Sequence, residues 1–208
     1  FQGQASEDVK EYVDKGQFGI WQETGYYINL AINVGAYEGK GYGESVGAMI
    51  ENEGLQIPSA DELKSRIIVL SEQNAEAVAA AADLLSIIQK FDLEPGFLSI
   101  PHPYKEFSAQ AAAYRLGVPF TSHPMIGHDI IYNHPMNHGA AIGRSAQTDF
   151  LRYAHNVSCL DGGVYMSIGS AVMSPMVFEK SLSMSQNLHI QNGEHMDKHY
   201  MVIVDLAE

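Results

Sequence analysis

The chain has 208 residues, of which 46% are hydrophobic and only 18% are charged, a composition that suits a folded protein with a substantial core. Acidic residues outnumber basic residues 25 to 12, and the formal net charge is −13. Because nucleic acid and anionic membranes attract clustered Lys and Arg, this charge argues against both as partners. No stretch approaches the ~20 apolar residues that span a bilayer.

Cys159 is the only cysteine, so the chain cannot form an intrachain disulfide. We expect its side chain to be a small buried apolar group rather than a reactive thiol. Together with the lack of a recognisable secretory signal, this predicts a reducing, cytoplasmic location. Residues 1–3 are typical of an engineered protease-site remnant and are left out of the expected fold.

Residues 4–91 are expected to form a helical region. Tyr26, Leu30 and Val34 recur at helical spacing, and the glycines within 39–43 end this first helix before a second one begins. The same glycines suggest a phosphate-binding loop, but no β-branched strand precedes them and no Lys-Ser/Thr follows. A tight turn between two helices is therefore the preferred interpretation.

The next part of this region has clear signals for the start of a helix. Ser59 and Glu62 have capping-box spacing, and the apolar residues after them repeat every three to four positions. This predicts one helix over 60–90, or two helices with a break near Asn74. The alternative is a short strand, "RIIVL", before a helix capped by Asn74. The alanine-rich second half is helical in every case.

Helical and strand-like patterns alternate from residue 92 to residue 208. Helices are expected at "EFSAQAAAYRLG", "SAQTDFLRYAHNVSCL" and "SPMVFEKSLSMSQNL", and apolar strands at "VPFTSH", "GGVYMSIGSAV" and "YMVIVDL". This alternation predicts an α/β fold, in which a Rossmann-like, mostly parallel sheet is flanked by helices. We expect 92–208 to form one integrated α/β core beside the helical region.

Ligands bind at the carboxyl ends of parallel strands, so the loops that follow the predicted strands are candidate sites. Gly169, Ser170 and Ala171 lie between a predicted strand and a predicted helix, where backbone N–H groups bind phosphate. Asp205 ends the last predicted strand and is suited to a ribose hydroxyl. The loop 121–139, which contains four histidines, follows the first predicted strand.

The histidines of this loop have three interpretations. As metal ligands, His123, His128 and His134 are residue types that bind zinc, with Asp129 beside them. Pro135 and the lack of a Glu after His134 exclude the helical zinc-protease motif. The preferred interpretation is a polar ligand pocket in which Asp129 and His128 are catalytic and polarise a substrate or move a proton. The third is packing at a subunit interface.

The blocks "GVPFTSHPMIGHDII" and "GGVYMSIGSAVMSPMVFEKSLSM", followed by "YMVIVDLAE", resemble in their order the motifs of the deoxyhypusine synthase superfamily. The similarity is closest to an uncharacterised bacterial branch and covers roughly residues 107–206. It implies a Rossmann-like, NAD-binding fold that assembles as a homodimer or homotetramer, with ligand sites near the subunit interface. By position, the roles in the NAD site fall on Gly127, Asp129, Gly169 and Ser170.

The chain departs from that family at the residue that carries its chemistry. It has no counterpart of the family's "W-G-K" segment, whose lysine forms the covalent intermediate, so deoxyhypusine synthesis is not expected. The resemblance then implies an NAD-binding enzyme, a transferase or oxidoreductase, that acts on a small polar or cationic substrate. A metal-dependent hydrolase that uses the histidine loop, and a non-catalytic ligand-binding or structural oligomer, are the alternatives.

Overall fold

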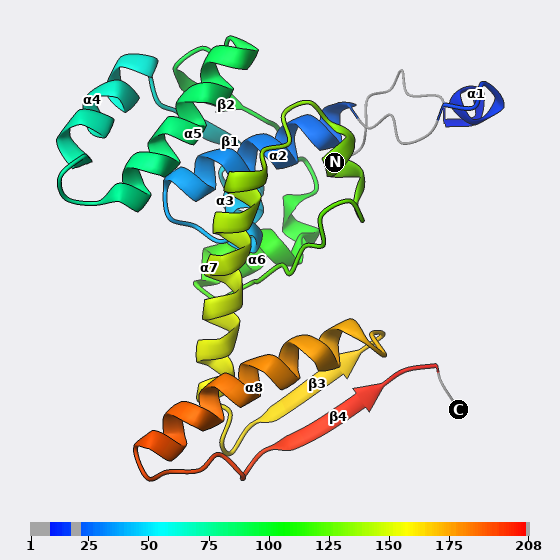
Figure 1. Cartoon of the computed structure of the whole chain (residues 1–208). Coiled ribbons are helices and arrows are strands. Elements are labelled where there is room, and N and C mark those ends of the chain that lie inside the picture. The colour runs from blue at the N-terminus through cyan, green and yellow to red at the C-terminus, as the bar shows by residue number, and fades with distance from the viewer. Residues whose placement is uncertain (1–8, 18–21, 207–208) are drawn as a thin grey trace. The chain divides into compact units, whose positions relative to one another are not determined.

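The computed structural model describes residues 9–17 and 22–206, and its internal contacts separate two compact units, Phe1–Asp149 and Phe150–Glu208. Figure 1 labels the helices and strands of each unit. Residues 1–3, the expected protease-site remnant, lie outside the described residues. None of the helices in the described part of the chain combines the length and the apolarity that a bilayer crossing requires.

The fold class predicted from the sequence is wrong. The structure is mostly helical (59%), and its described strands form two separate sheets of two strands each, not a Rossmann-like parallel sheet flanked by helices. The segment "VPFTSH" forms no strand, and Pro119 within it has no N–H to donate to a sheet ladder. The division into domains 4–91 and 92–208 stays a prediction, because compactness does not show which parts fold independently.

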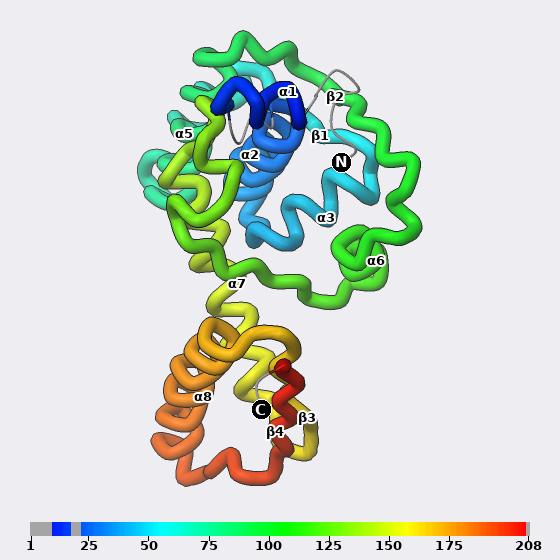
Figure 2. Tube along the Cα trace, turned by 90° about the vertical axis from the view of Figure 1, so that its right-hand side faces the viewer, coloured from blue at the N-terminus to red at the C-terminus, as the bar shows by residue number. Residues whose placement is uncertain are grey.

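The Phe1–Asp149 unit consists of helices around one short antiparallel pair of strands. In chain order its elements are α1 (Val9–Asp14), α2 (Gln22–Tyr37), α3 (Tyr42–Asn52), β1 (Gly54–Ile57), α4 (Ala60–Leu70), α5 (Ala75–Phe91), β2 (Gly96–Ser99), the 3₁₀-helix η1 (Lys105–Phe107), α6 (Ala109–Leu116), the 3₁₀-helix η2 (Ile130–Asn133) and the first part of α7 (Gly139–Ser158). Figure 2 shows α2 between α3 and α5, and both helices contact it.

The core of this unit forms where α2, α3 and α5 meet. Leu30 and Val34 of α2, which the sequence placed at helical spacing, are buried together with Met49 of α3 and Leu84 of α5. Because residues three to four apart lie on one face of a helix, α2 presents these side chains to both neighbours. This confirms the helical prediction for α2.

A buried carboxylate from α7 organises the glycine turn between α2 and α3. Asp149 is fully buried, and its Oδ2 accepts hydrogen bonds from the N–H of Gly43 (2.9 Å) and of Ser122 (2.8 Å). Gly43 lies in the first turn of α3, where N–H groups have no partner within the helix. A Cβ on Gly41 would lie 1.7 Å from Asp149 Oδ1, so this position requires glycine. The predicted tight turn is confirmed, and the anion at its N–H groups is a carboxylate of the protein itself.

Side-chain caps define the next helices. The Ser59 hydroxyl accepts from the N–H of Glu62 at 3.1 Å, and the Asn74 side chain accepts from the N–H of Ala77 at 3.0 Å. The two-helix interpretation with a break near Asn74 is therefore confirmed, and the alternative strand "RIIVL" is wrong, because these residues belong to α4. Gly117 ends α6 at φ +66°, as its predicted role as a C-terminal cap requires.

The Phe150–Glu208 unit contains the end of α7, β3 (Val164–Ile168), α8 (Met173–Gln191) and β4 (Tyr200–Val204). β3 and β4 are parallel neighbours, with Val164 opposite Tyr200. α8 packs against β3, where the ring of Phe178 stacks on that of Tyr165 with 3.8 Å between centroids, whereas all of β4 is exposed. The strand, helix and strand that the sequence predicts for this stretch are confirmed, although the larger sheet is not.

Replacing Asp149 by Ala is expected to lower the free energy of unfolding by about 3 kcal/mol, because two buried N–H groups lose a charged acceptor. Asp149→Asn retains one acceptor oxygen and should cost about half as much. Urea denaturation followed by circular dichroism measures both effects. Asp61, whose side chain is 92% exposed, provides the control: equal losses for Asp61→Ala and Asp149→Ala would contradict the capping role.

Candidate functional site

A pocket of about 430 Å³ opens in the Phe1–Asp149 unit, between α2, α3, the segment after β2 and the start of α6. This volume lies in the range of small-molecule sites, roughly 300–1,000 Å³. Apolar side chains from three elements contribute to its wall, together with several polar groups. The lining residues are Glu23, Ile28, Val46, Ile50, Ile100, Pro101, His102, Pro103, Tyr104, Lys105, Ser108 and Gln110.

Glu53, the C-cap residue of α3, holds the segment 101–105 that lines the pocket. Its carboxylate accepts from the N–H of His102 at 3.2 Å and from Lys105 Nζ at 3.0 Å. Lys105 Nζ also donates to the carbonyl of Glu51 at 3.0 Å, one of the carbonyls that the helix end leaves free. The hydrogen bond from Lys105 is the main reason why the pKa of Glu53 is lowered. The charge of this lysine is therefore balanced by a carboxylate.

Glu53 has a left-handed backbone, with φ +53° and ψ +38°. Residues other than glycine rarely adopt this conformation, which costs about 1 kcal/mol or more. Its own N–H bonds to the last turn of α3 and its carboxylate bonds to the segment 101–105. The strained residue thus turns the chain from α3 into β1 and at the same time fixes one wall of the pocket.

His102 is a buried wall residue in its neutral form. Its Nδ1 lies 2.7 Å from the carbonyl oxygen of Ile100, which can only accept, so Nδ1 carries the hydrogen and Nε2 carries the lone pair. Burial lowers the pKa of His102, and the hydrogen bond to Ile100 opposes this only in part. The imidazole is therefore uncharged at neutral pH.

Glu23, in the first turn of α2, is one of the residues that line the pocket. Its Oε2 is buried, and no described residue donates a hydrogen bond to it. A buried oxygen without a donor is costly, so such an atom calls for a partner. Since Lys105 is paired with Glu53 and His102 is neutral, the groups that line the pocket favour a ligand that brings N–H donors or a positive charge.

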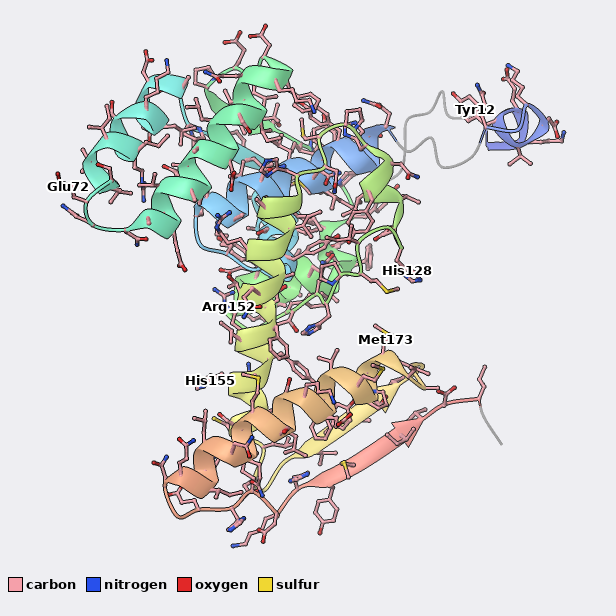
Figure 3. The ribbon with its side chains drawn as sticks, viewed as in Figure 1. Tyr12, Glu72, His128, Arg152, His155 and Met173 are labelled. Carbon is pink, nitrogen blue, oxygen red and sulfur yellow. The ribbon has the colours of Figure 1, made fainter. Side chains whose placement is uncertain are left out.

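The histidines of the loop 121–139 make separate contacts. His134 is buried against the ring of Tyr26, 5.9 Å between centroids, and its Nδ1 accepts from the N–H of Met136. His123 bonds to the hydroxyl of Thr121 at 3.2 Å. His128 is exposed on the loop, as Figure 3 shows. His134 thus has a packing role, while its proposed role as a ligand remains a prediction.

Within residues 9–17 and 22–206, no three His, Cys, Asp or Glu side chains are grouped in a way that would hold a metal ion. Asp129 is exposed, and its Oδ1 accepts from the N–H of Ile130 at 2.6 Å, so that it caps η2. Burial and, to a smaller extent, the charge of Asp129 raise the pKa of Tyr42 and of Tyr132. The catalytic roles of Asp129 and His128 stay predictions.

The predicted cofactor residues fall into different units. Gly127, at φ +89°, belongs to the Phe1–Asp149 unit, whereas the others belong to Phe150–Glu208. There the N–H of Gly169 donates to the carbonyl of Val204 at 2.8 Å, which joins the carboxyl ends of β3 and β4. The expectation that the histidine loop and the Ser170 turn emerge from neighbouring parallel strands is wrong, because no strand precedes the loop.

In the turn after β3, the hydroxyl groups of Ser167 and Ser170 already have partners. Ser170 Oγ accepts from the N–H of Ser174 at 3.0 Å, and Ser167 Oγ donates to the carbonyl of Ser170 at 3.1 Å. Ala171 is exposed at the start of α8, and Asp205 is exposed after β4. Gly169, Ser170, Ala171 and Asp205 therefore follow the carboxyl ends of β3 and β4, as the sequence predicts, while their cofactor roles stay predictions.

Cys159 is exposed, so the expectation of a buried apolar side chain is wrong.

The sequence did not predict the residues of the pocket, because Glu23 lies far in the sequence from His102 and Lys105 and no local pattern connects them. The one available signal was "PHPYK", where two prolines around His102 restrict the backbone and suit a rigid wall.

Comparisons of the chain with protein-family models, with curated proteins and with solved structures find no match. The similarity to the deoxyhypusine synthase superfamily therefore rests on the quoted motifs and stays a prediction. NAD binding and metal binding, which were inferred from the sequence, also stay predictions.

Acidification is expected to destabilise the Phe1–Asp149 unit. Burial lowers the pKa of His102, His123 and His134 below the ordinary value of 6.5. At pH values between the pKa of these histidines in the folded chain and their pKa in the unfolded chain, the unfolded chain binds more protons than the folded chain. The free energy of unfolding therefore rises with pH in this range. We expect it to fall as the pH drops below about 6.5, which urea denaturation at pH 7.5 and pH 5.5 measures.

The matched variants are His134→Gln and His155→Gln, the second at an exposed position. His134→Gln should flatten the dependence on pH, whereas His155→Gln should leave it unchanged. An equal or steeper loss of stability on acidification in the His134 variant would contradict the assignment.

Proposed function

We propose that the pocket beside His102 binds a small organic molecule that carries a protonated amine. The observation that carries this proposal is the buried Oε2 of Glu23, to which no described residue donates. An ammonium group supplies three N–H donors and a positive charge, which together satisfy such a carboxylate. The net charge of −13 attracts cations over a longer range.

The rest of the pocket suits the remainder of such a molecule. Ile28, Val46 and Ile50 give the wall an aliphatic surface that would cover a hydrocarbon chain. Tyr104, which is 58% exposed, also lines the pocket, and the face of an aromatic ring attracts a cation. An amine with a short aliphatic or aromatic group therefore complements the pocket better than an anion or an extended polar molecule.

The test compares ligands that differ only in charge. Butylamine and benzylamine are titrated against butanol and butyrate, with binding followed by chemical shifts in two-dimensional NMR spectra. We expect the amines to bind in the pocket, and Glu23→Gln to weaken them at least about tenfold, which corresponds to about 1.4 kcal/mol. Glu76→Gln, at the exposed first turn of α5, is the matched control.

Two results would contradict the proposal. In one, butanol or butyrate binds as tightly as butylamine, which would show that charge does not select the ligand. In the other, Glu23→Gln and Glu76→Gln bind the amines equally well, which would remove Glu23 from the site.

A second candidate is the binding of NAD or a related dinucleotide at the carboxyl ends of β3 and β4. One observation favours it: β3, α8 and β4 form a parallel strand–helix–strand unit, and Gly169 turns the chain between β3 and α8 at φ +67°. In nucleotide-binding proteins, backbone N–H groups at such a turn bind a phosphate at the start of the helix. Here the N–H groups of Gly169 and Ser174 are bonded to Val204 and Ser170, so a phosphate would have to use the N–H groups between them. Asp205 would then hold a ribose hydroxyl.

Calorimetry with NAD and NADH tests this second candidate. We expect Asp205→Ala to weaken the binding of NAD at least about fivefold, or about 1 kcal/mol, and Glu23→Gln to leave it unchanged. Asp129→Ala shows whether the predicted catalytic aspartate takes part. No heat of binding at millimolar NAD would remove the candidate.

We also propose that the chain acts in the cytoplasm as a homo-oligomer. A single cysteine in 208 residues supports a reducing compartment. The apolar residues exposed on β3 and β4 support self-association.

A further inference from the structure

In the two-stranded sheet of the Phe150–Glu208 unit, α8 covers the β3 side of one face, whereas Met201 and Ile203 of β4 on that face are 62% and 60% exposed. Among the described residues of this unit, no helix packs on the opposite face of either strand. In a parallel pair, residues opposite one another point to the same side, and alternate residues point to opposite sides. Tyr165 of β3 points to α8, where it stacks on Phe178. The residues on the other side, which we call the open strand face, are Val164, Met166, Ile168, Tyr200, Val202 and Val204.

All six side chains of the open strand face are apolar or aromatic, and they are between 39% and 75% exposed. Parallel strands occur almost exclusively with both faces covered, because apolar residues on each side are otherwise left in water. Single exposed apolar residues are common on protein surfaces, but six adjacent ones indicate an interaction site.

The unit has little other apolar burial of its own. Among its described residues, the buried hydrophobic side chains are Ala154, Val157, Phe178 and Met196. Units of this size bury a small fraction of their surface and usually need a further source of stability. Covering the open strand face would supply it.

We propose that the open strand face packs against the same face of a second copy of this chain, related by a two-fold axis; this names the contact surface of the homo-oligomer proposed above and rests on that proposal. The strands β3 and β4 contain no charged residue, whereas the whole chain carries a net charge of −13. Two chains of equal charge repel one another, so they associate most readily through an uncharged surface. A partner of opposite charge would instead require acidic groups on this face.

The size and the chemistry of the face both suit a symmetric contact. From their exposed fractions, the six side chains present about 600 Å² per copy, or about 1,200 Å² for the pair, the lower end of the range for stable interfaces. A two-fold contact places the same patch on both sides, so the patch must complement itself. Aliphatic side chains at alternate strand positions do so, as in the packing of two sheets about 10 Å apart.

The experiment measures the mass of the full chain in solution by size-exclusion chromatography with light scattering, from about 1 to 100 µM. We expect a dimer in the parent protein and a monomer in Met166→Glu, because a carboxylate in the contact must be desolvated on both copies. Met176→Glu, on α8, is the matched control, because Met166 is 54% and Met176 51% exposed. This control should remain a dimer.

A second, milder variant separates loss of the contact from loss of the fold. Val202→Thr retains a β-branched side chain of similar size, so the strand should persist while the contact loses an apolar group. We expect its dimer dissociation constant to rise at least about threefold with an unchanged circular dichroism spectrum. A parent chain that is monomeric at every concentration would overturn the proposal, and so would a dimer that neither Met166→Glu nor Val202→Thr weakens.

Discussion

The buried carboxylate of Asp149 is the contact on which the arrangement of the larger unit depends. It binds the N–H of Gly43 at the start of α3 and the N–H of Ser122 in the histidine-containing segment, so one side chain joins three parts of the chain. Gly41 provides the room for it. At the other end of α3, Glu53 holds the segment that lines the pocket. The carboxylate of Asp149 thus anchors the start of α3, and the carboxylate of Glu53 at its end positions the candidate site.

Two equally buried histidines, His134 and His102, have different surroundings, one in the packed interior and one at the candidate site. His134 lies against Tyr26, and its Nδ1 is used by the N–H of Met136. His102 is equally buried, yet it borders a pocket in which Lys105 is balanced by Glu53 and Glu23 has an oxygen without a described donor. A histidine-rich segment predicts a binding or catalytic site, because histidine binds metals and transfers protons. Here the polar groups that surround a cavity come from other segments, because α2, α3 and the start of α6 meet there.

The smaller unit shows why a correct local prediction led to a wrong fold class. β3, α8 and β4 form the expected strand, helix and parallel strand, and the apolar runs "VYMSI" and "YMVIV" have the composition of strands that are covered on both faces. Such runs indicate that both faces are to be buried, but they do not say what buries them. In a larger α/β protein the cover would be more helices of the same sheet. In this chain α8 covers only the β3 side of one face, and the open strand face is exposed.

What the sequence by itself determined is local. Ser59 and Asn74 mark the starts of their helices, and Gly117 marks the end of its helix, through hydrogen bonds or backbone angles within a few residues. The spacing of Leu30 and Val34 marks the buried face of α2. Only the tertiary structure decided that Pro119 and its neighbours form no strand, that Asp149 caps a helix more than a hundred positions earlier, and that Glu23 and His102 share a pocket. The physical reason is that capping and periodicity depend on neighbours along the chain, whereas a pocket or a sheet depends on which distant segments come together. Several arrangements of distant segments satisfy the same local pattern.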